Sequence, residues 1–428
     1  MSPVASDQYQ ESKRLHDASS RYLAGGVSTA FRMFERPVPL VCESAEGSSW
    51  TDVDGNRYID FVCGYGPVIL GHSDPEVCEA AGRAAASVQQ VGGQHREELE
   101  LAELLCQHVP CFEMVRISLS GSEAVHGAIR LARGVTGRSL VVKFAGHYHG
   151  WLDGAFTGIA HPPPGLPESA GQPHEAIAGV VVVNWNEPEA IKDLFARAGD
   201  RIAAVIMEPL PCNQGVLFPE GGYLELVREL TESAGAILIF DEVITGFRIG
   251  LGGAQERFGV IPDLTVVAKA MGNGFPVSAL GGRAELMEAI ATNTVVHAGT
   301  YNGGGVSVAA SLATLKRLSE DVGVHERMVG LGGRLMAGLE QAAANHGLSL
   351  VTAGPGPVFF AWFSQEPVRS FEDHLNADGA MYARFAEAML ARGVRIIPAG
   401  RWYLTTAHDE DDVDRALEAA DDALAGLS

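Results

Sequence analysis

The chain has 428 residues, of which 46% are hydrophobic and 20% are charged. This composition is typical of a folded globular protein, and the length predicts two or three domains with a large buried core. The 53 acidic and 31 basic side chains give a net charge of −22. That charge argues against nucleic acid and anionic membranes as partners, because both are bound through clustered Lys and Arg.

The sequence also lacks the signals of membrane and secreted proteins. Its apolar runs are well short of the roughly 18 residues that cross a bilayer, and MSPVASDQYQ does not resemble a secretory signal. We therefore expect a cytoplasmic protein without a membrane partner. The six cysteines show no CxxC pair, which favours reduced, structural thiols over a zinc site.

The predicted elements begin with an antiparallel hairpin, because an Asp-Gly turn signal lies between two short strand-like runs in residues 49–61. Nearly continuous apolar runs then predict five buried parallel strands, at 140–144, 180–184, 202–207, 236–240 and 264–268. Apolar residues at helical spacing predict helices at 223–234, at 327–345 and near the C terminus. This alternation indicates an α/β architecture.

These patterns predict a large domain, residues 69–322, with a mostly parallel central sheet. A smaller α+β domain is expected from both chain ends, residues 1–68 and 323–428. Between Gly146 and Gln172 the chain is rich in Gly and Pro. A loop of this length inside a compact domain is usually a functional lid or disordered.

Two charged residues end neighbouring predicted strands. Asp241 follows ILIF and Lys269 follows TVVA, so both fall at the carboxyl edge of the sheet, where open α/β folds bind ligands. A desolvated lysine can form a Schiff base, and a carboxylate can keep a pyridine nitrogen protonated. Taken alone, Lys269 could be a lysine at a strand end whose amine extends to solvent, and Asp241 could be a helix-capping residue. Together they indicate pyridoxal phosphate chemistry.

A phosphate site is predicted where Ser120, Gly121 and Ser122 precede a helical run. Backbone N–H groups, hydroxyls and the helix dipole converge there on an anion. An ordinary serine N-cap is the alternative. The chain has no GxxxxGKS/T motif, so a nucleoside triphosphate is not indicated.

The sequence His147-Tyr148-His149 offers only two neighbouring metal ligands, with no third at a recognisable spacing. We therefore expect no metal site. The Tyr148 ring is better interpreted as a surface on which a flat cofactor stacks, with a core tyrosine as the alternative.

Several motifs occur in one order along the chain: Ser120-Gly-Ser-Glu-Ala, Tyr148-His-Gly, Glu208-Pro, Asp241-Glu-Val-Ile-Thr-Gly-Phe-Arg, Lys269 and Gly299-Thr-Tyr-Asn. This order resembles the class III aminotransferases, which are fold type I pyridoxal phosphate enzymes, over nearly the whole chain. The glutamate-1-semialdehyde aminomutase branch is most similar, through Gly25-Gly-Val-Ser-Thr-Ala-Phe-Arg, Ala128-Ile-Arg-Leu-Ala-Arg-Gly and Leu280-Gly-Gly-Arg.

The resemblance implies that Lys269 binds pyridoxal 5'-phosphate as a Schiff base and that Asp241 pairs with the pyridine nitrogen. Val243 and Tyr148 would pack on the two faces of the ring. Further cofactor contacts are implied for Ser120, Gly121, Ser122, Glu208, Asn213 and Thr300. In the family the threonine comes from the neighbouring subunit, so a homodimer is implied.

Some positions resemble the aminomutase branch. Arg32 stands at a carboxylate-binding position, and Asn213 stands where many ordinary class III transaminases carry a glutamate. Ser122 replaces the usual Thr of the family, a change that keeps the hydroxyl.

Other positions depart from that branch. Its Gly-Ser-Gly lid is absent from residues 154–172, and its acidic residue near the C terminus falls at Gly400, followed by Arg401. An arginine there resembles the one that binds the 2-carboxylate of glutamate or 2-oxoglutarate in ordinary class III transaminases. Packing of the arginine stem under Trp402 is the alternative.

We therefore expect a transaminase that moves an amino group from an amino-acid or amine donor to a 2-oxo acid in a ping-pong course. An aminomutase or epimerase on the same cofactor is the nearest alternative. A nicotinamide dehydrogenase would require a GxGxxG motif after the first strand of a βαβ unit, which the sequence lacks. A non-catalytic binding protein would have no reason to hold Lys269, Asp241 and a phosphate loop together.

Overall fold

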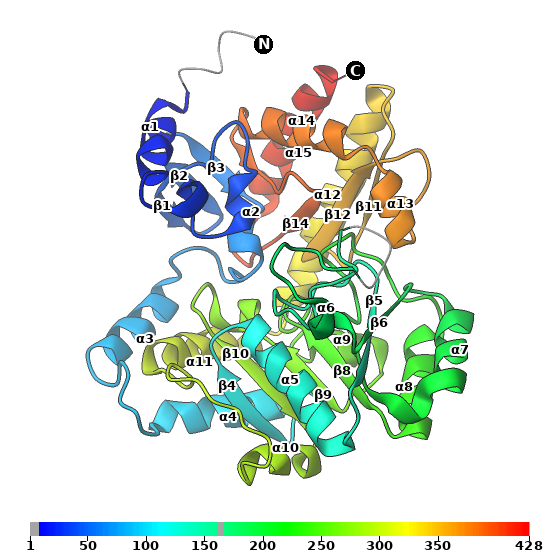
Figure 1. The fold of residues 1–428 in the computed structure, drawn as a ribbon. Helices are drawn as coiled ribbons and strands as arrows, with labels where there is room; N and C mark the ends of the chain where they lie inside the picture. The colour runs from blue at the N-terminus through cyan, green and yellow to red at the C-terminus, as the bar shows by residue number, and fades with distance from the viewer. Residues whose placement is uncertain (1–7, 161–165, 428) are drawn as a thin grey trace.

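The computed structural model describes residues 8–160 and 166–427, and they form two lobes (Figure 1). The lower lobe in that view contains the large central sheet. The upper lobe contains both chain ends, drawn in blue and red, together with two small sheets. None of the helices in the described ranges is long and apolar enough to span a membrane.

The central sheet has seven strands in the order β4-β10-β9-β8-β7-β5-β6. Their bounds are Met114–Ser118 (β4), Ser278–Gly282 (β10), Leu264–Val267 (β9), Ile237–Glu242 (β8), Ile202–Met207 (β7), Leu140–Phe144 (β5) and Val180–Val183 (β6). The five predicted strands are all present, and each pairs in parallel with its neighbour among them. The predicted α/β class with a mostly parallel sheet is therefore confirmed.

The strand β10 has no clear signal in the sequence. It runs antiparallel between β4 and β9 and ends in Gly281-Gly282. A Cβ at Gly281 would lie 2.7 Å from the ring of Phe112, so close packing requires a glycine there. The same glycines interrupt the apolar run by which a buried strand is recognised.

Helices cover the central sheet. All six residues of β7 and of β8 are buried, as expected for strands covered on both faces. The helices of this lobe are α3 (Pro75–Ala85), α4 (Arg96–His108), α5 (Gly121–Thr136), α6 (His174–Ile177), α7 (Pro188–Ala198), α8 (Tyr223–Ala234), α9 (Gly253–Phe258), α10 (Ala284–Ala291) and α11 (Gly305–Glu320). The predicted helix at 223–234 coincides with α8.

Segments from both ends of the chain build the upper lobe (Figure 1). Its four-stranded sheet contains β1 (Cys42–Glu46), β2 (Ser49–Asp52), β3 (Arg57–Asp60) and β13 (Val394–Arg395), and its three-stranded sheet contains β11 (Leu350–Ala353), β12 (Val358–Phe363) and β14 (Arg401–Tyr403). The antiparallel pair β2–β3 confirms the predicted hairpin, and β13 pairs in parallel with β3. The domain boundaries stay predictions.

The helices of the upper lobe are α1 (Gln10–Ser19), α2 (Ala30–Met33), α12 (Val324–Asn345), α13 (Phe371–Asn376), α14 (Gly379–Leu390) and α15 (Glu410–Ala425). The predicted helices at 327–345 and near the C terminus correspond to α12 and α15. Both bury an apolar face in one core cluster with β12, which includes Leu335, Phe359 and Leu424.

The long segment that follows β5 contains no strand or helix in its described part before α6. Buried hydrogen bonds fix the backbone of this segment although it has no regular secondary structure. Lys143 is fully buried, and its Nζ donates to the carbonyls of His147 (2.9 Å), Ala155 (3.2 Å) and Thr157 (2.5 Å). The run Pro162-Pro163-Pro164, which contributed to the loop prediction, lies outside the described residues.

A buried arginine joins the two lobes. Arg248 follows β8 in the lower lobe and is fully buried. Its guanidinium donates to the carbonyls of Gly66 (2.6 Å), Val68 (3.1 Å), Leu404 (2.7 Å) and Pro357 (3.4 Å). Pro357 O also accepts a hydrogen bond from Leu404 N (3.0 Å). Since the four carbonyls belong to segments from both ends of the chain, one cation links these segments to the lower lobe.

We predict that Arg248→Met lowers the midpoint of thermal unfolding by roughly 5 °C or more. The substitution leaves several buried carbonyls without a donor, and each such group costs about 1–3 kcal/mol. Thermal unfolding followed by circular dichroism measures the effect. Arg334→Met is the matched control, because Arg334 pairs with Asp414 on the surface and exposed pairs contribute about 0–1 kcal/mol. Equal midpoints for the two variants would contradict the prediction.

Candidate active site

The carboxyl ends of four parallel strands meet at one edge of the central sheet. Asp241 lies at the end of β8, Lys269 follows β9, Glu208 follows β7 and Tyr148 follows β5. In the strand ladder the last residues of β7 and β8 lie side by side, as do those of β8 and β9. These four residues therefore lie close together at the carboxyl edge of the central sheet.

The strand ends border a cavity of about 340 Å³. The predicted residues that line it are Ser120, Gly121, Ser122, Tyr148, Glu208, Asn213, Asp241, Val243 and Lys269. The lining residues that the sequence did not single out are Pro67, Leu119, Val125, His149, Gly150, Ile244, Ala268, Gly274, Phe275, Pro276 and Val277. The predicted residues Arg32, Arg401 and Thr300 are not among its lining residues.

The predicted phosphate loop is the N-terminus of α5. Ser120 Oγ accepts a hydrogen bond from Glu123 N (3.4 Å), and Glu123 Oε2 accepts one from Ser120 N (3.2 Å). The Ser120 side chain thus caps the helix, as the alternative interpretation stated. The N–H groups of Gly121 and Ser122 have no acceptor within the described chain, and at a helix N-terminus such groups attract an anion.

Two close approaches shape this end of the cavity. A Cβ at Gly121 would lie 2.9 Å from Val243 Cγ2, so the helix N-terminus rests directly on that valine. Gly150 has φ +85°, and a Cβ there would collide with Ser122 Oγ. The loop that carries Tyr148 therefore lies against the start of α5 only because a glycine stands at Gly150.

Glu208 organises the floor of the site. It is 3% exposed, and it accepts hydrogen bonds from Tyr148 N (2.8 Å), Cys212 N (3.1 Å) and Asn213 Nδ2 (3.0 Å). Burial and the neighbouring Asp241 charge raise the pKa of Glu208. The carboxylate holds the backbone of Tyr148, so its contribution to the site includes positioning that ring.

Asp241 has a partner that the sequence interpretation missed. Its Oδ2 lies 2.8 Å from Nδ1 of the fully buried His149, and its Oδ1 accepts from Val243 N (3.1 Å). His147 Nδ1 accepts from Glu208 N (3.0 Å), and burial lowers the pKa of His147 well below its usual value, so it stays neutral. The described residues contain no group of three metal-ligating side chains. His149 thus contacts the Asp241 carboxylate, whereas His147 holds the backbone of Glu208.

Lys269 stands in an unusual backbone conformation, with φ +45°, and its side chain reaches the cavity. Burial, together with the positive charge of Arg401, lowers the pKa of Lys269 to about 8, although Glu208 and Asp241 act in the opposite direction. No hydrogen bond to Lys269 Nζ occurs within the described chain. A strained residue with a poorly solvated amine is typical of a functional position.

Arg401 does not line the cavity itself, but it bonds to Asn213, which does. Its Nη1 donates to Cys212 O (3.0 Å) and to Asn213 Oδ1 (3.1 Å), and its guanidinium lies 5.5 Å from the ring centroid of Tyr403. Neither the carboxylate-binding role of Arg401 nor the alternative, packing of its stem under Trp402, is tested by these contacts, so both stay predictions.

Two further predicted residues, Arg32 and Thr300, do not line this cavity. Arg32 belongs to α2, a short helix without buried residues. Thr300 is exposed, and its carbonyl accepts a hydrogen bond from the side chain of Gln90. Their predicted contacts with substrate and with a partner's cofactor stay predictions.

The comparisons with known proteins agree with this geometry. Residues 31–424 match the family described as aminotransferase class-III. The chain belongs to the class III aminotransferase family. It is 44% identical to the glutamate-1-semialdehyde 2,1-aminomutase of Thermomicrobium roseum, over 98% of this chain and 99% of the relative. The predicted family is therefore confirmed.

Solved structures agree as well. An ω-transaminase from Sphaerobacter thermophilus superposes with a TM-score of 0.93 at 33% identity, covering 97% of each chain. A transaminase with pyridoxal phosphate bound gives a TM-score of 0.91 at 29% identity, covering 98% of each chain. The chain is thus a pyridoxal phosphate-dependent enzyme of fold type I.

We predict that Lys269 of the apoenzyme loses its proton with a midpoint near pH 8, because burial and Arg401 both favour the neutral amine. Its rate of acetylation by acetic anhydride, read by mass spectrometry, should rise through pH 8 and level off above it. A model lysine peptide should continue to rise towards about pH 10.4.

The same measurement on Arg401→Ala should show a higher midpoint, since a positive neighbour is removed. The matched control is Arg392→Ala, whose exposed side chain donates to Ala388 O and Asp422 O on the surface. A midpoint for Lys269 that coincides with the peptide would contradict the prediction.

Proposed function

We propose that this enzyme is an aminotransferase that moves an amino group from an amino-acid or amine donor to a 2-oxo acid in a ping-pong course. The observation that carries the proposal is that Lys269 and Asp241 line one cavity, while Arg401 donates to Asn213, which also lines it. Lys269 supplies an amine, Asp241 a buried carboxylate and Arg401 a cation beside the lining.

The cavity suits pyridoxal phosphate. The free N–H groups of Gly121 and Ser122 would hold the phosphate, and Asp241 would hold the pyridine nitrogen. Val243 and Tyr148 would bound the ring on its two faces. When bound, this cofactor supplies an electron-withdrawing ring that carries the amino group between the two substrates.

Lys269 would act twice in such a reaction. It would hold the cofactor at rest, and once displaced its Nζ would move a proton between the donor's amine-bearing carbon and the cofactor carbon that lies on the other side of the amino nitrogen. A pKa of about 8 suits both tasks, because roughly a fifth of the amine is then neutral near pH 7.4, far more than for a lysine with its ordinary pKa of about 10.4. Asp241, kept in place by His149 and Val243 N, would hold a negative charge at the far side of the ring.

Arg401 would receive the carboxylate of the 2-oxo acid. Asn213 links it to the site, because Asn213 Oδ1 accepts from Arg401 while Asn213 Nδ2 donates to Glu208. A guanidinium binds a carboxylate through two parallel hydrogen bonds. Arg32 is proposed as a second carboxylate contact, for the donor.

We predict that Arg401→Ala slows the half-reaction between enzyme loaded with pyridoxamine phosphate and 2-oxoglutarate or pyruvate by roughly ten- to a hundredfold. Loss of a charged hydrogen-bond partner costs about 1.5–3 kcal/mol. Single-turnover absorbance measures this step without the donor half-reaction. Arg392→Ala is the control, and unchanged acceptor kinetics in a folded Arg401→Ala variant would reject the role.

An aminomutase is the second candidate, favoured by the relative from Thermomicrobium roseum that shares 44% identity. The stoichiometry separates the two functions. A transaminase consumes one 2-oxo acid for each donor converted. Conversion of a single substrate into its amino-shifted isomer, with no acceptor consumed, would establish the mutase instead.

We also propose a homodimer in which Thr300 reaches the cofactor site of the partner subunit. Exposed apolar side chains surround this residue in sequence and space: Val91 is 54% exposed, Val296 49% and Tyr301 65%. The hydrogen bond from Gln90 to Thr300 joins the two segments that carry them. Clustered exposed apolar residues of this kind mark protein interfaces.

We predict that the protein sediments as a dimer and that Val91→Arg shifts it towards the monomer, since burial of a charge at an interface is unfavourable. Sedimentation velocity measures both. Leu375→Arg is the control, because Leu375 is 44% exposed on α13, away from Thr300 in the chain. A monomeric wild-type protein would overturn the dimer.

A further inference from the structure

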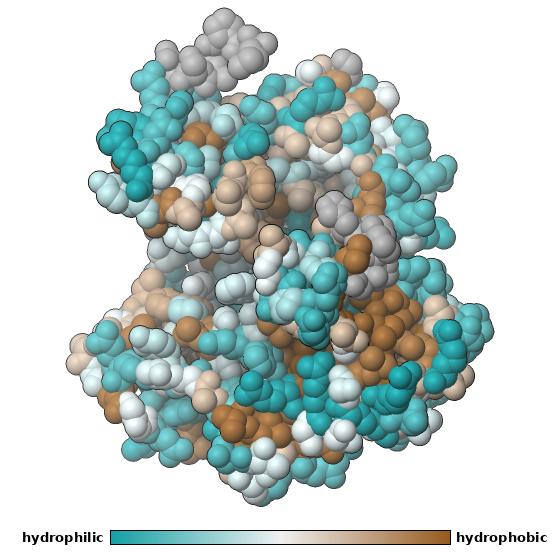
Figure 2. All heavy atoms as spheres, in the orientation of Figure 1, coloured by the Kyte–Doolittle hydropathy of each residue, from teal (hydrophilic) through white to brown (hydrophobic). Residues whose placement is uncertain are grey.

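The segment that contains α2 and the two residues after it has little core packing of its own. Phe31, Met33 and Phe34 are 59%, 45% and 69% exposed. Figure 1 places α2 at the lower edge of the upper lobe, facing the lower lobe, and Figure 2 shows brown and tan spheres over it beside a hollow between the lobes. Its position must therefore depend on a few specific contacts.

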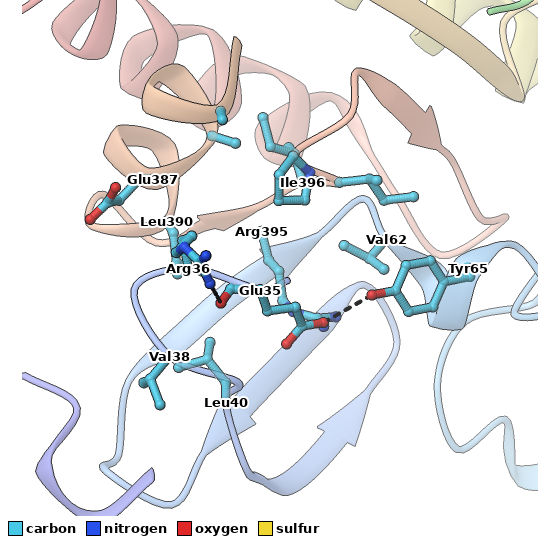
Figure 3. A pocket seen from close by; sticks show the side chains of 14 residues that line it. Glu35, Arg36, Val38, Leu40, Val62, Tyr65, Glu387, Leu390, Arg395 and Ile396 are labelled. Atoms are coloured by element: carbon cyan, nitrogen blue, oxygen red, sulfur yellow. Dashed lines mark hydrogen bonds and ion pairs between the residues drawn. The ribbon is translucent and has the colours of Figure 1, made fainter. Parts of the chain in front are cut away.

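Glu35 supplies the main tether. Its Oε1 accepts from Arg395 Nη2 (3.0 Å) and from Tyr65 OH (3.1 Å), as Figure 3 shows. The Glu35 side chain is 14% exposed and that of Arg395 13%. Burial and the Glu35 carboxylate raise the pKa of Tyr65, so its hydroxyl keeps a proton to donate. Phe31 O lies 3.3 Å from the same hydroxyl.

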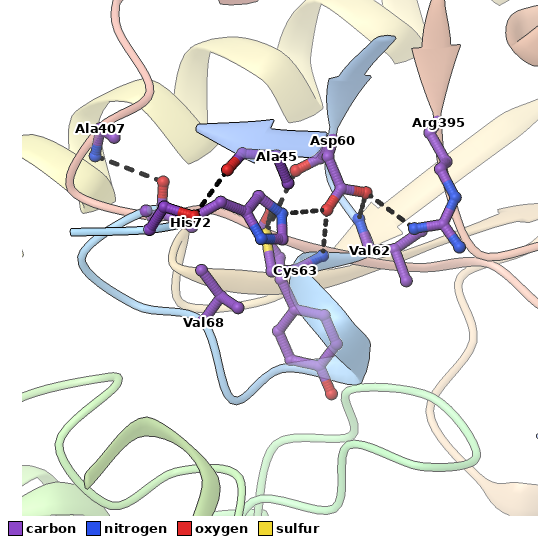
Figure 4. A network of polar contacts seen from close by, with 12 residues as sticks. Ala45, Asp60, Val62, Cys63, Val68, His72, Arg395 and Ala407 are labelled. Carbon is purple, nitrogen blue, oxygen red and sulfur yellow. Dashed lines mark hydrogen bonds and ion pairs between the residues drawn. The ribbon is translucent and has the colours of Figure 1, made fainter. Parts of the chain in front are cut away.

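Arg395 is itself fixed by a second carboxylate. Its Nη1 donates to Asp60 Oδ1 (3.2 Å), and Asp60 Oδ2 lies 2.8 Å from His72 Nε2 (Figure 4). Asp60 is fully buried. A network of buried charged hydrogen bonds holds a defined geometry. The α2 segment is thus attached to a rigid part of the upper lobe.

This attachment places one aromatic ring beside Tyr148. The Phe31 ring centroid lies 5.9 Å from that of Tyr65 and 6.2 Å, edge-on, from that of Tyr148. Tyr148 lines the cavity that contains Lys269. Phe34, three residues later, makes no ring contact within the described chain.

We propose that Phe31 is a specificity-determining residue, which selects donors that carry an aryl or other large apolar group beside the amine-bearing carbon. The inference rests on the proposed function and deepens it. The Phe31 ring is largely exposed and lies next to Tyr148, which lines the cavity, so it loses contact with water when such a group lies against it. Glu35 is the positioning residue that keeps this ring in place.

Binding of unreactive carboxylates tests the inference without turnover. Isothermal titration calorimetry of the holoenzyme would use 3-phenylpropanoate and butanoate. The ratio of their affinities should fall about tenfold in Phe31→Ala, the scale of an apolar pocket contact. It should fall less in Phe31→Leu, which restores part of the apolar surface. Phe34→Ala, the matched control, should keep the ratio of the wild-type enzyme.

Glu35→Gln tests the tether by the same ratio. Loss of the charge on Glu35 should free the α2 segment and reduce the preference for 3-phenylpropanoate, even where the unfolding midpoint is unchanged. A ratio equal to that of the wild-type enzyme in a folded Phe31→Ala variant overturns the inference. An equal loss of both ligands overturns it too, because that result indicates a general effect through Tyr148.

Turnover with amine donors distinguishes this inference from the proposed function. If no donor is converted with any 2-oxo acid, the proposed function fails, while the binding ratio still decides the role of Phe31. If donors are converted, kcat/KM for aryl donors relative to small aliphatic donors should fall about tenfold in Phe31→Ala. An unchanged ratio of kcat/KM would leave the function intact and reject the specificity role.

Discussion

Parallel pairing of four central strands determines where this protein can carry out its chemistry. Because β9, β8, β7 and β5 end at the same edge, Lys269, Asp241, Glu208 and Tyr148 border one cavity although they are far apart in the chain. At the ends of the strands, backbone groups are free to bind a ligand, and the surrounding buried side chains make the local dielectric constant low. A lysine amine placed there loses part of its proton affinity, and a carboxylate needs fixed donors to stay in place.

Buried ionisable side chains hold several of the loops around the site in place. Lys143 donates to three carbonyls of the loop that carries Tyr148, and Glu208 accepts hydrogen bonds from two loops. Arg248 binds carbonyls from both chain ends. An isolated buried charge is costly, so each of these groups specifies a local backbone arrangement that satisfies it.

Under the proposed function, the upper lobe would supply the side chains that distinguish substrates. Arg401 bonds to Asn213, and Phe31 lies beside Tyr148; both of these partners line the cavity. Both depend on polar contacts that cross between distant segments, Glu35 with Arg395 among them. The lower lobe thus provides most of the cavity lining, whereas the proposed substrate contacts depend on how the upper lobe is held.

The sequence by itself determined the α/β class, the five parallel strands and the place of Lys269 and Asp241, because continuous apolar runs and the residues that end them are local signals. It did not reveal β10, in which Gly281 is required by close packing against Phe112 and Gly282 by close packing against Asp263 and Leu264. The bond between His149 and Asp241, the four carbonyls around Arg248 and the place of Phe31 beside Tyr148 were decided only by the tertiary structure. Each depends on segments that are distant in the chain and meet only after the sheet and both lobes have formed.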